Sequence, residues 1–460
     1  MLNILNDVLG YLLMAALAVC GIWFSLRTKG VQFRMIGEMF RLLADKPKAK
    51  GNEKPISSFQ AFAVSVATRV GTGNLAGVAT AIALGGPGAV FWMWVMALLG
   101  AATAFVEATL GQLFKRRNGD TFIGGPAYYI MYGLHRKPMA YLFAVLITLT
   151  FGLSYNSIQS NTICSAMNHA FGWDPLVAGI VLATISLFIV FGGIHRIAKL
   201  STVLVPVMAL GYFLLVIVIM VMNYQLIPHV FKVIFTDAFD ISPAVGGTIG
   251  TAIIYGAKRG LFSNEAGAGS APNVAATADV SHPVKQGLIQ SLGVFTDTLL
   301  VCSCTAFIIL ISGLYDNPSV NGIALVQESL NSEVGAVGPY FIAIAILLFA
   351  FSSIVGNYFY GEVNIHFMTK SRRAMTIYRI CSAGVMVIFG AVSSLDTVWT
   401  LGDICTAMLA FVNLIAIVSL GKYAFRLLDD YRQQKTRGIQ NPLFHRDQMA
   451  EIAEDVECWE

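Results

Sequence analysis

Long apolar runs, separated by short polar segments, make up most of the chain. A helix needs about 20 apolar residues to cross the hydrocarbon core of a bilayer. Eleven runs are long enough, and they lie at 8–26, 58–83, 89–114, 139–165, 176–192, 200–222, 244–281, 286–313, 339–364, 374–394 and 398–424. Blocks of about ten residues with strict polar and apolar alternation, which are typical of membrane barrels, are absent from the sequence. The pattern therefore predicts an all-α polytopic membrane protein with eleven transmembrane helices.

The composition supports a membrane protein and excludes some other classes. Of the 460 residues, 56% are hydrophobic and only 12% are charged, whereas a soluble domain carries about 25% charged residues. The net charge of +4 is too small to indicate a nucleic acid as a partner. The first run has no basic residue before it and no small-residue cleavage site after it, so we expect it to stay as a helix rather than to be removed as a signal peptide.

The basic residues predict the orientation of the chain, because loops on the cytoplasmic side retain positive charge. Loops on one side, together with the tail, hold 26 of the 30 Lys and Arg residues, whereas the opposite side holds only Lys232. We therefore expect a multi-pass protein of the cell (inner) membrane with its amino terminus outside and its carboxyl-terminal tail in the cytoplasm. The tail is mixed in charge, and we expect it to be amphipathic or disordered.

Two of the eleven runs carry polar interruptions near the middle of the bilayer. The second contains Gly71-Thr72-Gly73-Asn74, and the seventh contains Ser263-Asn264-Glu265 followed by Gly267 and Gly269. Irregular backbone at membrane depth persists only where it lines a cavity or is buried in protein. The alternative is that the glycines only let helices pack closely, but close packing does not explain Asn74, Asn264 and Glu265 at this depth.

The positions of the two interruptions indicate a repeated architecture. They fall in the first span of each of two successive groups of five spans, and an odd number of spans inverts the second group. Paired broken helices in inverted halves indicate the central binding site of a transporter. We thus expect an amino-terminal helix with a basic loop (1–57), a first five-helix repeat (58–222), an inverted second repeat (244–424) and a cytoplasmic tail (425–460).

A broken helix offers two kinds of backbone group to a ligand. Carbonyls are exposed where the first half ends, near Val70, and N–H groups where the second half begins, near Asn74. An α-amino acid beside a sodium ion would satisfy both groups, although a nucleobase or a sugar could also use such a break.

The interrupted segments carry a recognisable signature. The runs Gly71-Thr72-Gly73-Asn74-Leu75-Ala76-Gly77 and Gly260-Leu261-Phe262-Ser263-Asn264-Glu265-Ala266-Gly267, together with Phe351-Ser352-Ser353-Ile354-Val355-Gly356, resemble those of the alanine or glycine:cation symporter family, in particular its bacterial alanine- and glutamine-type members. The resemblance implies import of a small neutral amino acid with sodium, or sometimes protons, on a leucine-transporter-like five-plus-five inverted fold. It implies no other cofactor and no metal ion beyond sodium.

The resemblance also implies site residues. Sodium would be held by the carbonyls of Ala67 and Val70 and by the hydroxyls of Ser352 and Ser353. The alternative for the two serines is hydrogen bonding within their own helix. Substrate would contact Thr68, Thr72, Gly73, Asn74, Gln159, Phe262, Asn264 and Asn357. Phe262 could equally be a core residue. Some family members have tryptophan at the position of Asn357, so the smaller side chain here could admit an amide-bearing substrate such as glutamine.

Among the charged side chains inside predicted spans, which require partners, Arg69, Arg259 and Asp403 are candidates for a role at the site. Arg69 could neutralise the substrate carboxylate, but we favour a structural ion pair with Glu107, Asp297 or Glu362. Arg259 and Asp403 could pair as a gate above the site, or each could have a separate partner.

The sequence offers little support for an enzyme or a channel. It contains no Walker A loop and no His-Glu-x-x-His motif, and it contains no run that resembles a selectivity filter. We therefore expect a secondary symporter that imports alanine, glycine or glutamine with sodium by alternating access. The sequence does not indicate an oligomeric state.

Overall fold

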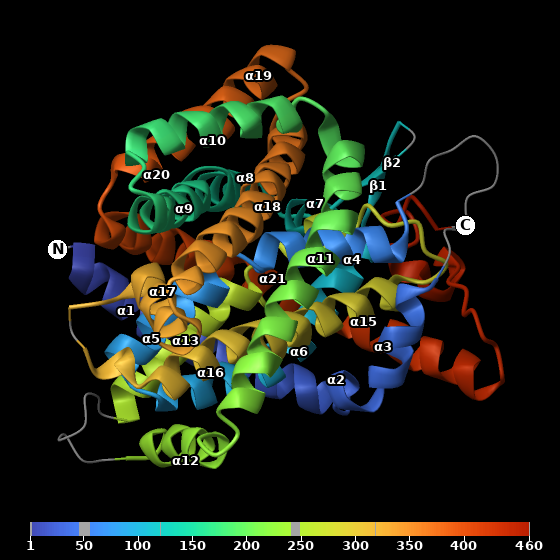
Figure 1. Ribbon diagram of the computed structural model, residues 1–460. Coiled ribbons are helices and arrows are strands. Elements are labelled where there is room, and N and C mark those ends of the chain that lie inside the picture. Colours follow the sequence, from blue (N-terminus) through green and yellow to red (C-terminus); the bar gives the residue numbers. More distant parts are fainter. Residues whose placement is uncertain (1, 46–55, 120, 241–248, 318, 460) are drawn as a thin grey trace.

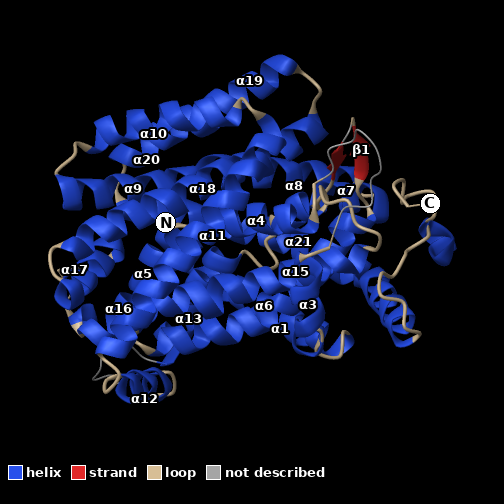
Figure 2. Ribbon diagram, turned by 45° about the vertical axis from the view of Figure 1, so that its right-hand side comes forward, coloured by secondary structure: helices blue, strands red, loops and turns tan. Residues whose placement is uncertain are grey.

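The computed structural model describes residues 2–45, 56–119, 121–240, 249–317 and 319–459. Helices make up almost all of these residues, as Figure 2 shows. Their one sheet is an antiparallel hairpin of β1 (Arg116–Asn118) and β2 (Thr121–Ile123), in which Arg117 lies opposite Phe122.

The helical elements follow one another along the chain in this order: α1 (Leu2–Arg27), α2 (Val31–Arg34), α3 (Ile36–Leu43), α4 (Ser58–Arg69), η1 (Gly73–Gly77), α5 (Val78–Gly85), α6 (Gly88–Leu113), α7 (Pro126–Gly133), α8 (Lys137–Leu149), η2 (Thr150–Tyr155), α9 (Asn156–Phe171), α10 (Pro175–Val190), α11 (Gly193–Met222), α12 (Ile227–Asp237), α13 (Ile249–Asn264), α14 (Ala271–Ala275), α15 (Pro283–Val294), η3 (Phe295–Cys302), α16 (Ser303–Ser312), η4 (Leu314–Asp316), α17 (Gly322–Val334), α18 (Val337–Met368), α19 (Arg372–Ile380), η5 (Cys381–Val385), α20 (Met386–Val392), α21 (Leu395–Thr436) and η6 (Arg446–Ile452).

Eight helical segments of the described chain are long and apolar enough to cross a membrane, and each coincides with a predicted span. The other three predicted spans are 58–83, 176–192 and 244–281. The first is divided between α4, η1 and α5, the second is the sixteen-residue α10, and the third is divided between α13 and α14. Residues 244–248 of the third lie outside the described residues. The structure thus confirms a polytopic helical membrane protein, and the number eleven stays a prediction.

The helices form two groups that face each other (Figure 1). In the first, which we call the α6 group, α6 packs against α1, α13 and α15. In the second, the α9 group, α9 packs against α10, α18 and α20. Helix α4 contacts both α15 and α18, so the first broken helix lies where the two groups meet.

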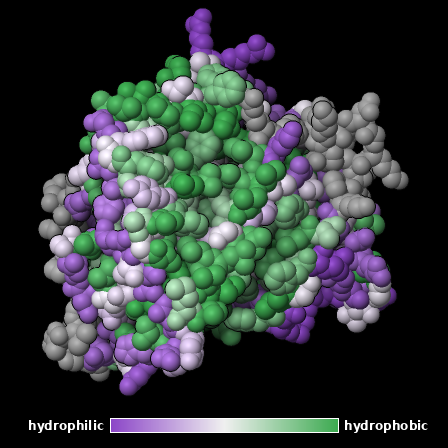
Figure 3. Space-filling model, in the orientation of Figure 1, coloured by the Kyte–Doolittle hydropathy of each residue, from purple (hydrophilic) through white to green (hydrophobic). Residues whose placement is uncertain are grey.

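A belt of apolar side chains covers the outside of the molecule. Figure 3 shows it as a broad green surface on the face where Figure 1 places α10 and α11. Large exposed hydrophobic side chains of these two helices include Val177, Ile180, Val181, Phe188, Val203, Val207, Leu210, Leu214, Val218 and Val221. A surface of this size on a soluble monomer would be unusual, so the belt faces lipid.

The connecting segments gather at two opposite ends of the molecule. The amino terminus, α12 and α17 lie toward the left of Figure 1, whereas α3, the β1–β2 hairpin and the carboxyl terminus lie toward the right. Helix α3, the hairpin and the tail belong to the segments that the sequence predicts to be basic and to lie on one side of the membrane. Their position at the second end agrees with the predicted alternation of loops. The cytoplasmic assignment of that end stays a prediction.

The carboxyl-terminal tail is folded onto this second end, which contradicts the disordered alternative of the expected amphipathic or disordered tail. Its Trp459 side chain is buried and donates through Nε1 to the carbonyls of Gln112 and Leu113, at 3.3 and 3.1 Å. The Phe444 N–H donates to the Ser281 carbonyl at 3.0 Å. The sequence gives little sign of this docking, because the apolar residues of the tail are widely spaced among charges.

An acidic side chain on α3 links that helix to the end of α21. Glu38 accepts hydrogen bonds from Arg41 at 2.6 Å and from Tyr431 at 2.5 Å. Burial alone raises the pKa of Glu38, but these hydrogen bonds and the charges of Arg41 and Lys435 outweigh burial and lower the pKa to about 2.

A carboxyl group whose pKa is lowered by folding adds stability above its unfolded pKa and loses it as the pH falls to the folded value. We therefore expect Glu38→Gln to lower the thermal midpoint of the detergent-solubilised protein at neutral pH. The difference from the original protein should shrink between about pH 4.5 and about pH 2. A difference that does not change with pH would contradict this assignment.

Candidate functional site

The first broken helix is interrupted where the sequence predicted. Helix α4 starts with a capping box of Ser57 and Gln60 and ends at Arg69. Val70 has an extended conformation (φ −75°, ψ 94°), and the helical backbone resumes in η1 at Gly73. The Gly71 N–H donates to the Asn74 side-chain oxygen at 2.9 Å, which stabilises the turn. The carbonyls at the end of α4 are thus free of helical N–H partners.

The second broken helix is interrupted between Asn264 and Ala271, as predicted. Three residues of this segment have left-handed backbones: Glu265 (φ 57°), Gly267 (φ 89°) and Gly269 (φ 81°). Glycine adopts such angles without steric cost, which explains why the sequence carries two glycines here.

The four predicted sodium ligands lie together. The hydroxyls of Ser352 and Ser353 both lie 3.1 Å from the Ala67 carbonyl oxygen, and Ser353 lies 3.3 Å from the Val70 carbonyl oxygen. Both hydroxyls also lie within hydrogen-bond distance of the Phe349 carbonyl of their own helix. The alternative for the two serines, hydrogen bonding within α18, is therefore also present in the structure. The result is a cluster of neutral oxygens, which are the ligands that suit a hard cation.

The space around residue 71 explains why it is glycine. A Cβ atom there would collide with the Ser353 hydroxyl and lie 2.7 Å from the Gln159 side-chain oxygen. The same Gln159 oxygen accepts from the Thr72 N–H at 2.9 Å. A Cβ atom at Gly73 would lie 3.0 Å from the Phe262 ring. The structure therefore brings Gly71, Thr72, Gly73, Gln159 and Phe262 to one place.

Aromatic rings form the wall of this site on the side of α13 and α21. The Phe262 ring lies between Tyr155 and Trp399, with centroid distances of 4.4 and 4.5 Å. The Arg259 guanidinium lies over Trp399 at 4.1 Å and pairs with Asp403 at 2.8 Å. Arg259 and Asp403 thus pair with each other, and Phe262 belongs both to the core and to the wall of the site.

Several buried polar atoms around the site have no partner among the described residues. They are the Thr72 hydroxyl, both atoms of the Asn357 amide and the Trp399 indole nitrogen. Asn357 lies one helical turn after Ser353, on the same face of α18. Unpaired buried polar groups are costly, so these atoms fit a site that a polar ligand completes.

Some predicted substrate contacts are occupied by the protein itself. The Asn74 amide nitrogen donates to Asp297 at 2.7 Å, and the Thr68 hydroxyl lies 2.6 Å from that of Tyr360. The Asn264 amide is likewise used by Thr298 and by the Ala266 N–H. Contact between Asn264 and substrate stays a prediction.

Among the residues that the structure describes, Arg69 does not form the ion pair that we favoured, with Glu107, Asp297 or Glu362. Its side chain is buried, and one guanidinium nitrogen donates to the Gln290 carbonyl at 3.2 Å. The other two nitrogens have no described partner. Glu362 pairs instead with Arg379 at 2.9 Å. Glu107, Glu265 and Asp297 lie within electrostatic range of Arg69 but form no direct ion pair with it.

Sequence reasoning missed three residues at or beside the site: Tyr155, Tyr360 and Trp399. An aromatic residue in an apolar span carries no sign of the face on which it lies. Asp297 was considered only as a partner of Arg69, and the structure shows it bonded to Asn74 instead.

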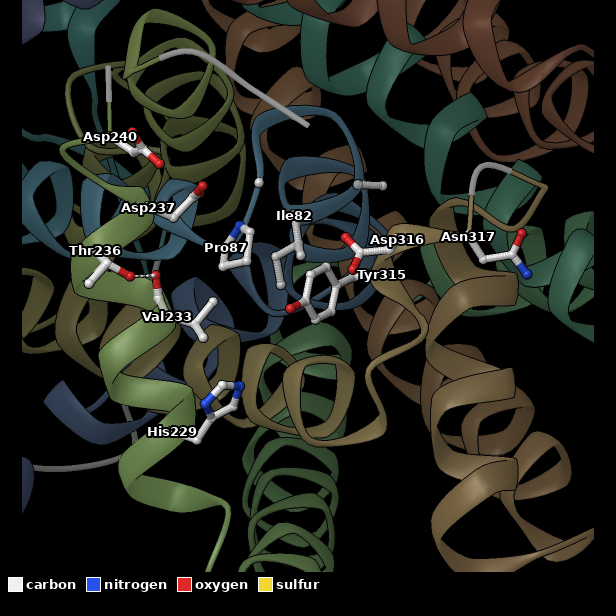
Figure 4. Close-up of a pocket in the computed structure, with 12 residues that line it drawn as sticks. Ile82, Pro87, His229, Val233, Thr236, Asp237, Asp240, Tyr315, Asp316 and Asn317 are labelled. Carbon is white, nitrogen blue, oxygen red and sulfur yellow. Dashed lines mark hydrogen bonds between the residues drawn. The ribbon is translucent and has the colours of Figure 1, made fainter. Parts of the chain in front are cut away.

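A separate cavity of about 460 Å³ lies at the end of α5, beside α12 and η4. Figure 4 shows Asp237 and Asp240 on one side of it and Tyr315 and Asp316 on the other. Its nearest residue in the broken helix, Ile82, is eight residues beyond Asn74, which is roughly 12 Å along the helix. The cavity is therefore not part of the predicted substrate site.

The Arg259–Asp403 pair permits a test of the gate. Both side chains are largely buried, and removing one partner of such a pair leaves an uncompensated charge. We expect Arg259→Gln and Asp403→Asn each to reduce uptake by about tenfold or more while expression stays intact. Exchanging the two residues should restore part of the uptake. Unchanged uptake by both single variants would show that the pair does not gate the site.

Comparison with known proteins places these features in a family. Residues 1–446 match the family described as the sodium:alanine symporter family. The probable sodium/glutamine symporter GlnT of Bacillus subtilis is 48% identical over 99% of this chain and 95% of its own length. The amino-acid carrier protein AlsT of the same organism is 47% identical over 100% of this chain and 97% of its own. The sodium/alanine symporter AgcS of Methanococcus maripaludis is 38% identical over 91% of this chain and 94% of its own.

Two solved structures share the fold at low sequence identity. A manganese transporter of Eremococcus coleocola covers 81% of this chain with a TM-score of 0.53 and 16% identity, and 79% of that transporter is matched. A Na⁺-coupled sialic acid symporter covers 84% of this chain, with 82% of its own length matched, a TM-score of 0.51 and 17% identity. The chain thus shares its fold with these two transporters. With a family match across nearly the whole chain and relatives almost half identical to it, the protein belongs to the sodium:alanine symporter family.

Proposed function

We propose that the protein imports a small neutral amino acid together with sodium by alternating access. The observation that carries this proposal is the cluster of four oxygens at the end of α4, formed by Ala67, Val70, Ser352 and Ser353. Two come from α4 and two from α18 of the α9 group, so a sodium ion would bridge elements that can separate. No cofactor besides the coupling ion is required.

Within this class the site favours a substrate that carries an amide. Both atoms of the buried Asn357 amide lack a described partner, and a second primary amide would offer one donor and one acceptor in return. The name of the 48% identical relative includes glutamine. We therefore place glutamine before alanine and glycine as the substrate.

The architecture that we propose has eleven transmembrane helices, in which 58–222 and 244–424 are inverted five-helix repeats of the leucine-transporter type. The two breaks, each in the first span of its repeat, support this assignment. The distribution of basic residues among the loops supports an amino terminus outside and a tail in the cytoplasm, in a cell (inner) membrane.

Transport would proceed by movement of the broken helices relative to the α9 group. A zwitterionic substrate carries no net charge, so one sodium ion brings one positive charge across. Membrane potential contributes about 2.3 kcal/mol per charge per 100 mV, which supports on the order of 50-fold accumulation.

The experiment that tests the proposal is uptake of labelled glutamine, alanine and glycine into proteoliposomes with and without an inward sodium gradient. We expect saturable, sodium-dependent uptake that an inside-negative potential stimulates, with glutamine transported best. Uptake driven by a pH gradient without sodium would contradict the proposed sodium site. Uptake of none of the three would contradict the substrate class.

A further inference from the structure

The Glu265 carboxyl group has an unusual position. It lies in the break of the second broken helix, is 2% exposed, and has the left-handed backbone described above. Of the three described residues other than glycine with positive φ, Lys29 and His135 are exposed, and Glu265 alone is buried. This conformation costs on the order of 1 kcal/mol and persists at functional sites. The surrounding structure therefore holds a carboxyl group here at a cost.

A line of hydroxyl groups connects Glu265 to the first broken helix. Ser270 donates to the Glu265 carboxylate at 2.5 Å. The Tyr360 hydroxyl interacts with Ser270 and lies 2.6 Å from the Thr68 hydroxyl of α4. All four side chains are buried. The carboxyl group is thus linked through two side chains to the residue that follows the predicted sodium ligand Ala67.

Charged and titratable groups from several elements lie near Glu265. Arg69 comes from α4, Glu107 from α6 and Asp297 from η3, while Tyr155 and Tyr360 complete the set. Three carboxylates would outnumber one guanidinium, and a buried excess of charge is costly. Binding one proton reduces that excess from two negative charges to one.

The hydrogen bonds indicate which carboxyl group takes the proton. Glu107 accepts from the Gly267 N–H and from the Asn413 amide. Asp297 accepts from Asn74, Ser263 and Thr298. Glu265 accepts from Ser270 alone among the side chains that the structure describes. Donors stabilise the charged form of a carboxyl group, so Glu265 is the least stabilised of the three as a carboxylate.

We propose that Glu265 is a proton-binding site that opposes sodium binding at the end of α4. A hydronium ion gives its proton to the carboxylate, an O–H bond forms on Glu265, and water is left. The protonated group no longer contributes negative charge near the sodium ligands, so sodium binds less tightly. By linkage, sodium binding must release the proton to the same extent. This inference rests on the sodium site of the proposed function.

The direct test is proton release on addition of sodium chloride to the full-length, detergent-solubilised protein in weak buffer with a pH-sensitive dye. The original protein should release protons, and Glu265→Gln should release none. Glu107→Gln is the matched control, because it removes a neighbouring buried carboxylate that lies outside the hydroxyl line, and it should still release protons. Tyr360→Phe keeps the ring and should release fewer. Release by Glu265→Gln equal to that of the original protein, or its loss in Glu107→Gln instead, would overturn the proposal.

A second measurement separates this proposal from the proposed function. The sodium concentration for half-maximal uptake should rise about fivefold or more from alkaline to acidic pH in the original protein. In Glu265→Gln it should be high and independent of pH. If sodium stimulates uptake without any proton release or pH shift, the proton site is wrong and the symporter stands. If sodium has no effect on uptake by the original protein, the proposed function itself fails.

Discussion

Replacing Ser353 with alanine is expected to raise the sodium concentration for half-maximal uptake by roughly tenfold to 150-fold. The Ser353 hydroxyl is the one predicted ligand that contacts both α4 carbonyls, Ala67 and Val70. An interaction with a charged partner contributes about 1.5–3 kcal/mol, and about 1.4 kcal/mol corresponds to a factor of ten. The measurement is initial uptake at saturating amino acid over a series of sodium concentrations.

The matched control is Ser419→Ala, since Ser419 lies in α21 and donates only to the Ile415 carbonyl of its own helix within the described structure. It should leave the sodium dependence unchanged. Ser352→Ala should have a smaller effect than Ser353→Ala, because Ser352 contacts Ala67 but not Val70. If Ser353→Ala lowers the thermal midpoint but not the sodium affinity, the hydroxyl serves only its bond to Phe349.

Replacing Asn357 with leucine is expected to reduce glutamine uptake by about a hundredfold and to leave alanine uptake nearly unchanged. Leucine has a similar shape but no polar atoms, so the amide of a bound glutamine would be left without partners. Each unpaired buried group costs about 1–3 kcal/mol. The quantity to compare is kcat/KM for the two substrates in the same proteoliposomes.

Asn357→Trp adds a steric test of the same residue. The larger ring should exclude glutamine while alanine still fits. An equal loss of glutamine and alanine uptake in both variants would mean that Asn357 supports the fold of α18 rather than the choice of substrate.

The breaks in the two helices could be predicted because their signals are local. Gly71 and Gly73, or Gly267 and Gly269, interrupt an apolar run within a few residues, and in the structure each helix is interrupted at or beside these glycines. The sodium ligands could be named only through the resemblance, since nothing in the pattern of α18 distinguishes Ser353 from a serine that bonds to its own helix.

Several features that depend on distant parts of the chain escaped prediction. Arg69 is more than 200 residues away from Gln290, and no periodicity could indicate that it would lie against a carbonyl rather than a carboxylate. The contacts of the Phe262 ring with Tyr155 and Trp399 join three separate spans. The Asn264 side chain bonds to Thr298 of the next span.

The docked tail has a consequence for how motion in this protein would be observed. Trp459 is attached to the end of α6 and Phe444 to the segment before α15, while α21 leads into the tail. Elements from both predicted repeats are therefore fastened together at one end of the molecule. A spectroscopic label on the tail would report the displacement of α6 and α15 rather than its own diffusion, and its distance to a label on α19 would follow the separation of the two helix groups through a turnover.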